Sequence, residues 1–272
     1  MTDKVLYEEK TINQATKWRA KAWMARWSMM LWVVFTAAIS IASWQLFPGA
    51  HFWVDGGWQG IKLVTSVDLV LGPVLFMLVA NPAKTRHARR MDTASLLTVQ
   101  ILAMTWGSFQ VYTQRPVAIS YMPEGFAMPL VMNDFTLQKI NPDTLPASRI
   151  GDLPAFYVSL PTGKNALADL LKLLNQSPAP VAAQSSLLTP LFSHEPQVFS
   201  NTKRFQNYWS GEGTRAWQAW TSRHDGRPAS DYRFIILMGR YGNAILVLDQ
   251  KKHLVGHIQL PGEVLPAALQ GT

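Results

Sequence analysis

The stretch FPGAHFWVDGGWQGIKLVTSVDLVLGP, residues 47–73, is the part of the chain on which the fold prediction depends. It joins a glycine-rich, aromatic loop to an apolar segment that carries a carboxylate, Asp68, near its middle. An ionised Asp at the centre of a bilayer costs about 2.5–3.5 kcal/mol on insertion scales, so such a residue normally faces a bundle interior and has a partner. Asp68 is therefore the first candidate site residue.

Three apolar segments predict a membrane protein. Residues 28–47 and 61–80 each have the length of about twenty residues that crosses a bilayer as a helix, and residues 94–113 form a third segment of this kind. A cleaved signal peptide is the alternative for the first segment, but two further segments follow it. We therefore expect three transmembrane α-helices within residues 28–114.

Polar residues inside these expected spans suggest how the helices contact one another. Gly72 and Pro73 interrupt the second span, where proline removes a backbone donor and predicts a kink. Gln100 lies in the third span and needs a polar partner within lipid, which makes it the candidate to meet Asp68.

The distribution of positive charges predicts an orientation. The polar segment 1–27 and the loop 81–92 are rich in Lys and Arg, while residues 48–60 contain neither. By the positive-inside rule the N-terminus is cytoplasmic and the chain after residue 114 is outside, so an odd number of spans exports the C-terminal domain. Segment 1–27, in which tryptophans alternate with cations, is either an amphipathic helix on anionic lipid headgroups or a solvated flank.

The net charge of +8 does not indicate a nucleic-acid partner. Such a partner requires cations gathered on one soluble face, whereas here many of them flank apolar segments. The chain has no cysteine, so disulfides and thiolate metal sites are excluded.

Residues 115–272 read as one α+β domain. Apolar spacing predicts helices at 165–175 and near 214–222, and a first strand at 117–121. An antiparallel β-meander is expected from three strand-like runs that are separated by turn residues, at 232–238, 243–249 and 253–260.

Residues that suggest catalysis or cofactor binding fit these chemistries poorly. SLPTGKN at 159–165 lacks the leading glycine and the Ser or Thr after lysine that a phosphate-binding loop needs. His253 and His257, or His194 with Glu195, do not form a compact set of metal ligands. We therefore expect no enzymatic activity, no metal and no cofactor.

The turn at residues 55–58 and the residue Asp68 can each be interpreted in two ways. Asp55, Gly56, Gly57 and Trp58 form a turn that is either part of an interfacial aromatic belt or a docking surface for another membrane segment. Asp68 either holds the helix bundle together or recognises a partner, and proton or ion translocation is the weakest option for a single carboxylate.

Several of these motifs together resemble the TfpX/TfpZ family of type IV pilin accessory proteins, which includes FimB-like proteins. The matching positions are Pro48-Gly49, Asp55–Gly60, Val67–Pro73, Asn81–Lys84, Gln100 and Gln114-Arg115-Pro116. The resemblance covers about a quarter of the chain and is much weaker in the C-terminal part.

This resemblance implies a chaperone-like accessory protein of a bacterial inner membrane, with a periplasmic C-terminal domain. It also implies that the protein contacts a type IV major pilin and supports pilin stability and pilus assembly. Pilus assembly-platform proteins are further expected partners. The candidate partner-binding residues are then the Asp55–Trp58 turn, Asp68, Gly72, Pro73, Gln100 and Arg115. A membrane-anchored periplasmic binding module and a small ion- or solute-handling membrane protein remain the alternatives.

Overall fold

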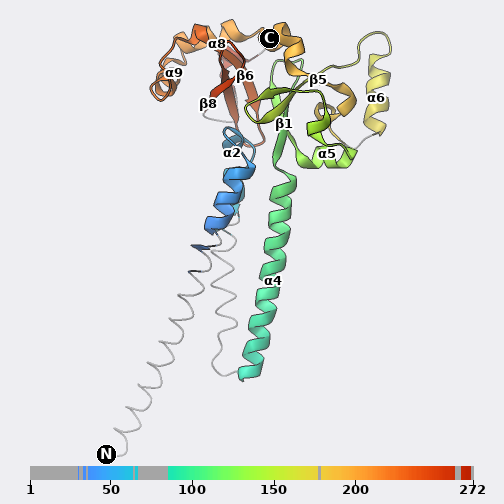
Figure 1. Cartoon of the computed structure of the whole chain (residues 1–272), viewed down its shortest axis with the longest axis vertical. Coiled ribbons are helices and arrows are strands. Elements are labelled where there is room, and N and C mark those ends of the chain that lie inside the picture. The colour runs from blue at the N-terminus through green and yellow to red at the C-terminus, as the bar shows by residue number, and fades with distance from the viewer. Residues whose placement is uncertain are drawn as a thin grey trace, which may run out of the picture. The chain divides into compact units, whose positions relative to one another are not determined.

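The computed structural model describes residues 30, 33–34, 36–63, 65–66, 85–176, 179–260 and 265–270 (Figure 1). The chain divides into two compact units. One contains Met1–Ser43 and Gly60–Phe109, and the other contains Trp44–Gln59 and Gln110–Thr272. The second unit is thus built from two stretches of chain that lie far apart in the sequence.

The prediction of three transmembrane helices is wrong. Within the described ranges, no helix is both long enough and apolar enough to cross a membrane. Helix α4, Arg86–Thr113, has 28 residues, but charged residues occupy its first two turns, and Thr, Ser and Gln residues interrupt the apolar remainder. The fold class is corrected to an α+β domain preceded by helical segments. The predicted orientation and inner-membrane localisation rested on the three spans and are corrected with them.

The second unit contains an eight-stranded mixed sheet. Seven strands follow the order β3-β4-β1-β2-β6-β7-β8, and β5 pairs with β4 beside β3. The pairs β1–β4 and β2–β6 are parallel, while the other pairs are antiparallel. The strands are β1 Pro116–Tyr121, β2 Ala127–Val131, β3 Ser148–Ile150, β4 Leu153–Val158, β5 Leu188–Pro190, β6 Arg233–Met238, β7 Asn243–Leu248 and β8 Leu254–Leu260.

The sheet is curved, so that strands at opposite ends of its order approach each other. Gly151, in the turn between β3 and β4, lies so close to β8 that a Cβ at this position would be 3.2 Å from Leu254 Cδ2. Side chains alternate along each strand, and this alternation divides the core between an inner, concave face and an outer face.

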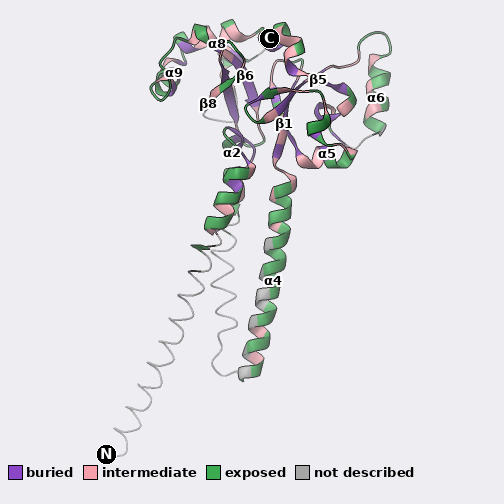
Figure 2. Cartoon of the chain, viewed as in Figure 1, coloured by how far each residue is buried: buried purple, intermediate pink, exposed green. Residues whose placement is uncertain are grey.

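Helices pack on the outer face of the sheet, whose strands are largely buried and are drawn in purple in Figure 2. Phe234, Ile236 and Ile245 pack with the aromatic side chains of α8 (Thr202–Ser210) and α9 (Thr214–Thr221). Phe156 and Val158, further along the sheet, pack with α5 (Met132–Gln138) and the turns at 181–187. The other helices are α2 His51–Val54, α6 Ala166–Gln176 and α7 Glu195–Val198, and the 3-10 helices are η1 Pro142–Thr144, η2 Val181–Ala183, η3 Ser185–Leu187, η4 Leu191–His194, η5 Ala229–Asp231 and η6 Ala267–Leu269.

Candidate functional site

Segment 44–59 belongs to the hydrophobic core of the sheet domain. The short helix α2 contributes Val54, which is 0% exposed, and the preceding Ala50 is also buried. Both pack on the concave face with residues of β6 and β7 such as Leu237 and Leu246. Residues 48–59, which were expected to lie in an interspan loop, are therefore part of a packed element of the domain.

The turn between β6 and β7 holds this segment through its backbone. The N–H of Tyr241 donates a 2.8 Å hydrogen bond to the carbonyl oxygen of Val54. Gly239 lies so close that a Cβ there would overlap the same carbonyl oxygen and would be 2.5 Å from Oδ1 of Asp55. On the other side of the contact, Gly56 has a φ of +111° and lies against the Tyr241 ring. Gly56 is required because glycine alone adopts such a φ readily, and Gly239 is required because a Cβ there would overlap the Val54 carbonyl oxygen.

A buried polar pair lies inside the same contact. Nδ1 of His51 donates to Oδ2 of Asp55, one helical turn later, and both side chains are almost inaccessible to water. Oδ1 of Asp55 has no hydrogen-bond partner among the described residues. Burial, together with the charges of His51 and His224, lowers the pKa of His257 on β8 below its ordinary value. The segment therefore carries titratable groups into the domain.

The solvent-exposed side of segment 44–59 is aromatic. We define the aromatic surface as Trp44, Trp53, Trp58 and Tyr241, all of which are more than one third exposed. Phe52 lies beneath it, with ring centroids 5.1 Å from Trp44 and 5.0 Å from Trp53, and Trp53 is 5.9 Å from Trp58. Residues 44–61 contain no Lys or Arg, and their only acidic residue is the buried Asp55. The aromatic surface is thus apolar and adjoins a stretch of chain without exposed charge.

The structure places the predicted site residues in different environments. Asp55 and Gly57 are buried, Gly57 against the Phe52 ring, while Trp58 is on the aromatic surface. Arg115 lies just before β1, with its guanidinium 3.7 Å from the centre of the Tyr112 ring. Arg115 also lines a cavity of about 310 Å³ whose walls include Asp143 and Asp152.

The remaining predicted residues are not tested by the structure. Asp68, Gly72 and Pro73 lie outside the described residues, and of Gln100 only the helical backbone in α4 is described. The expected contact between Asp68 and Gln100 therefore stays a prediction.

The histidines rejected as metal ligands on sequence grounds have other contacts. His253 is 75% exposed and lies 3.4 Å from Asp249, and His194 stacks on Tyr157 with ring centroids 4.2 Å apart. In the part of the chain that the structure describes, no group of three or more His, Cys, Asp or Glu residues is arranged to hold a metal ion.

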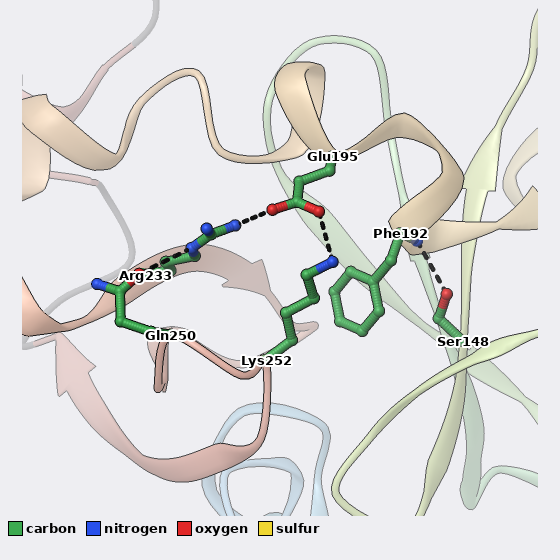
Figure 3. A network of polar contacts seen from close by, with 6 residues as sticks. All are labelled: Ser148, Phe192, Glu195, Arg233, Gln250 and Lys252. Carbon is green, nitrogen blue, oxygen red and sulfur yellow. Dashed lines mark hydrogen bonds and ion pairs between the residues drawn. The ribbon is translucent and has the colours of Figure 1, made fainter.

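Local sequence patterns did not predict a polar network between α7 and the meander, which Figure 3 shows. The Glu195 carboxylate at the start of α7 accepts hydrogen bonds from Arg233 of β6 and from Lys252 in the turn before β8. Hydrogen bonds from Lys252 and then Arg233 lower the pKa of Glu195. The cations also lie over rings, Arg233 4.8 Å from Phe199 and Lys252 5.2 Å from Phe192. The network joins α7 to the meander. Arg233 and Lys252 lie 38 and 57 positions after Glu195, a separation that no local pattern reveals.

Comparisons with known proteins give one consistent relationship. Three curated relatives are fimbrial assembly proteins of Dichelobacter nodosus. The chain is similar to fimbrial assembly proteins. It is 24% identical to the serogroup E1 protein over 121 residues, which is 44% of this chain and 46% of the relative. It is 27% identical to the protein of serogroups C1 and C2 over 78 residues, 29% of this chain and 58% of the relative.

The serogroup I protein is 26% identical over 106 residues, 39% of this chain and 40% of the relative. The chain thus spans between two fifths and three fifths of the length of these relatives. No protein-family model matches the chain, and no solved structure matches it. The similarity supports a relationship to pilus assembly proteins, but not membership of the TfpX/TfpZ family in particular.

Proposed function

We propose that this protein is a pilus assembly factor that binds a type IV pilin directly and, like a chaperone, supports its stability and its incorporation into the pilus. The similarity to fimbrial assembly proteins supports the process. Direct binding is supported by the aromatic surface, where large apolar side chains remain exposed on a well-packed domain. Exposed apolar patches of this kind are typical of protein–protein contacts.

The absence of exposed charge in residues 44–61 favours an apolar partner. Interface cores are depleted in charged residues and enriched in tryptophan and tyrosine, which is the composition of the aromatic surface. Because the backbone and core contacts of Val54 hold this surface on the domain, its rings are positioned before a partner arrives. The proposal is for a binding protein, not an enzyme.

Site-specific photocrosslinking in cells tests the proposal. Probes replace Trp53 or Trp58, and a control probe replaces Met128 on β2, which at 38% is as exposed as Trp58. We expect pilin crosslinks from Trp53 and Trp58 and none from Met128. Crosslinks only to assembly-platform proteins would overturn direct binding of pilin, and equal crosslinking from Met128 would overturn the role of the aromatic surface.

A variant separates binding from folding. Trp53→Ala with Trp58→Ala removes two of the four rings of the aromatic surface, while the buried Val54 and Phe52 remain. We expect loss of pilin co-purification, with a cost in the free energy of unfolding of about 1–3 kcal/mol per site because each ring packs against a neighbouring ring. The alternative, a module that binds glycan or another secreted factor, predicts that pilin recovery is unchanged in this variant.

A further inference from the structure

Strand β8, Leu254–Leu260, lies at one edge of the sheet. Among the residues that the structure describes, it pairs with β7 alone, and no backbone hydrogen bond reaches its other side. The turn between β3 and β4 approaches the beginning of the strand, where Gly151 lies close to Leu254, and a register shift against β7 lies at the same end. The regular stretch Gly256–Leu260 therefore keeps one row of backbone donors and acceptors open to another strand.

The two edges of the sheet differ in how they are protected. Natural proteins usually prevent pairing at an edge by keeping the strand short or by placing proline or charged residues in it. The opposite edge follows this rule, because β3 and β5 each have only three residues. β8 has seven residues, and its sequence LVGHIQL contains no proline, Lys, Arg, Asp or Glu. The edge of β8 thus lacks the features that prevent the addition of a strand.

Side chains of β8 alternate between two environments. Ile258 and Leu260 are buried on the outer face with the aromatic residues of α8 and α9. His257 and Gln259 lie on the inner face, where their partners on β7 are residues of the inner core, and Gln259 is exposed. A strand added beside β8 presents its side chains to the same two faces. The segment that fits is therefore extended, with apolar residues beside Ile258 and Leu260 and polar residues beside Gln259.

The edge of β8 adjoins the aromatic surface. Leu260, at the end of β8, pairs with Asn243, the first residue of β7. Tyr241 of the aromatic surface lies two residues before Asn243, in the turn between β6 and β7. Neither β8 nor residues 44–61 contain Lys or Arg, and their one acidic residue, Asp55, is buried. The two surfaces are therefore continuous and favour the same uncharged partner.

We propose that the open edge of β8 binds an extended segment of the pilin as an added strand, an assignment that rests on the proposed function. Backbone hydrogen bonds along Gly256–Leu260 supply affinity, and the alternation of side chains selects the segment. The sheet then gains one strand beside the aromatic surface, so that a single partner occupies both.

Photocrosslinking in cells tests the added strand and the proposed function separately. A probe replaces Gln259, and the probes at Trp58 and Met128 serve as reference and control. We expect Gln259 and Trp58 to crosslink to the same pilin, with the Gln259 crosslinks confined to one short segment that alternates apolar and polar residues. Pilin crosslinks from Trp58 without any from Gln259 would overturn the added strand and leave the proposed function intact.

Two further outcomes of the crosslinking are informative. The lack of pilin crosslinks from both Gln259 and Trp58 would overturn the proposed function together with the added strand. Crosslinks from Gln259 to a second copy of this chain, in place of pilin, would show that the edge joins two copies and would overturn the pilin segment as its partner.

A pair of matched variants tests the edge by charge. Gln259→Lys places a charge on the open edge, which is a usual protection of an edge strand. Gln218→Lys is the control, because Gln218 is also exposed but lies on α9. We expect loss of pilin co-purification with Gln259→Lys and native recovery with Gln218→Lys, at equal thermal midpoints of unfolding. Native recovery of pilin with Gln259→Lys would contradict the added strand.

Hydrogen–deuterium exchange, resolved by NMR at single amides, distinguishes an added strand from any other contact at this edge. The complex with pilin is compared with the free protein. Every second amide of Gly256–Leu260 points away from β7, and we expect these amides to gain protection in the complex, while those that already bond to β7 change little. Uniform protection along β8, or none, would overturn the added strand.

Discussion

The backbone N–H of Tyr241 donates a 2.8 Å hydrogen bond to the carbonyl oxygen of Val54, although most of the sequence of the sheet domain lies between these two residues. It ties a residue that precedes α4 to the turn between β6 and β7, the first two strands of the meander. A hydrogen bond between these two backbone groups requires segment 44–59 to lie very close to the turn between β6 and β7. Gly239 leaves the space for this because it has no side chain.

Gly239→Ala is expected to lower the free energy of unfolding by about 1–3 kcal/mol, the usual cost of overpacking. The added methyl group would overlap the Val54 carbonyl oxygen and the Asp55 carboxylate, which cannot both move without breaking the contact. Denaturant unfolding measures the effect. Gly60→Ala is the control, because no atom lies within 4 Å of a Cβ there, and its stability should be unchanged or slightly raised.

Val54→Ala is expected to cost about 2 kcal/mol. Each buried methylene-sized group contributes about 0.8 kcal/mol, and the cavity that remains adds to the loss. Val34→Ala, at an exposed helical position, should change the free energy of unfolding by less than about 0.5 kcal/mol. Equal effects of the two substitutions would mean that segment 44–59 does not contribute to the core in solution.

Glu195→Gln is expected to destabilise the domain by no more than about 1 kcal/mol at pH 7, because the carboxylate is partly exposed and its ion pairs are screened by water. The pKa of Glu195 is lowered in the folded state, so its contribution is present above the unfolded pKa of about 4.5 and is lost as pH falls through the folded pKa. Urea unfolding of both proteins between pH 7 and pH 3 should therefore show a difference that shrinks on acidification.

A double-mutant cycle identifies the partner of Glu195. Lys252→Met removes the ammonium group and keeps an apolar chain of similar length. We expect the two substitutions together to cost less than the sum of the single costs, by a few tenths of a kcal/mol. Strict additivity would show that the ion pair contributes nothing measurable.

Tyr121→Phe is expected to cost about 1–3 kcal/mol, since the buried carbonyl oxygen of Val198 loses the 3.1 Å hydrogen bond from the Tyr121 hydroxyl. Burial, and then the charge of Tyr157, raise the pKa of Tyr121 to about 12 in the folded state. Its contribution is therefore full below the unfolded pKa of about 10 and is lost as pH rises towards 12.

Unfolding of the native and Tyr121→Phe proteins at several alkaline pH values checks this, with exposed Tyr112→Phe as the control. The difference between native and variant should shrink between pH 10 and pH 12. A constant difference would contradict the assigned hydroxyl contact.

Local sequence patterns predicted the elements that depend on local properties. The three runs expected for the meander coincide with β6, β7 and β8 to within one residue at each end, and the helices expected at 165–175 and 214–222 coincide with α6 and α9. Alternation of apolar residues and the turn residues between them were sufficient, because these features act over a few positions.

The parallel strand pairs and the docked segment were not predicted, because both depend on contacts between distant positions. Nothing in Ile119 indicates that it pairs with Ala155, and the aromatic stretch around Phe52 is equally compatible with a membrane interface. Apolar content misled the fold prediction in the same way. Of the hydrophobic residues at 48–54, which were assigned to a loop between membrane spans, Ala50 and Val54 are core residues of the domain. Gly239 and Gly242 indicate locally that another segment of the chain lies very close to this turn, but they do not identify which segment it is.

The separation of the two stretches that build the sheet domain has a consequence for synthesis. Val54 leaves the ribosome early, but the strands that bury it, β6 and β7, are made almost two hundred residues later. At about 5–20 residues per second this interval is on the order of ten seconds or more. During that time Ala50, Phe52 and Val54 have no core to enter, so the nascent chain presents these apolar residues to whatever factors accompany it until β7 is complete.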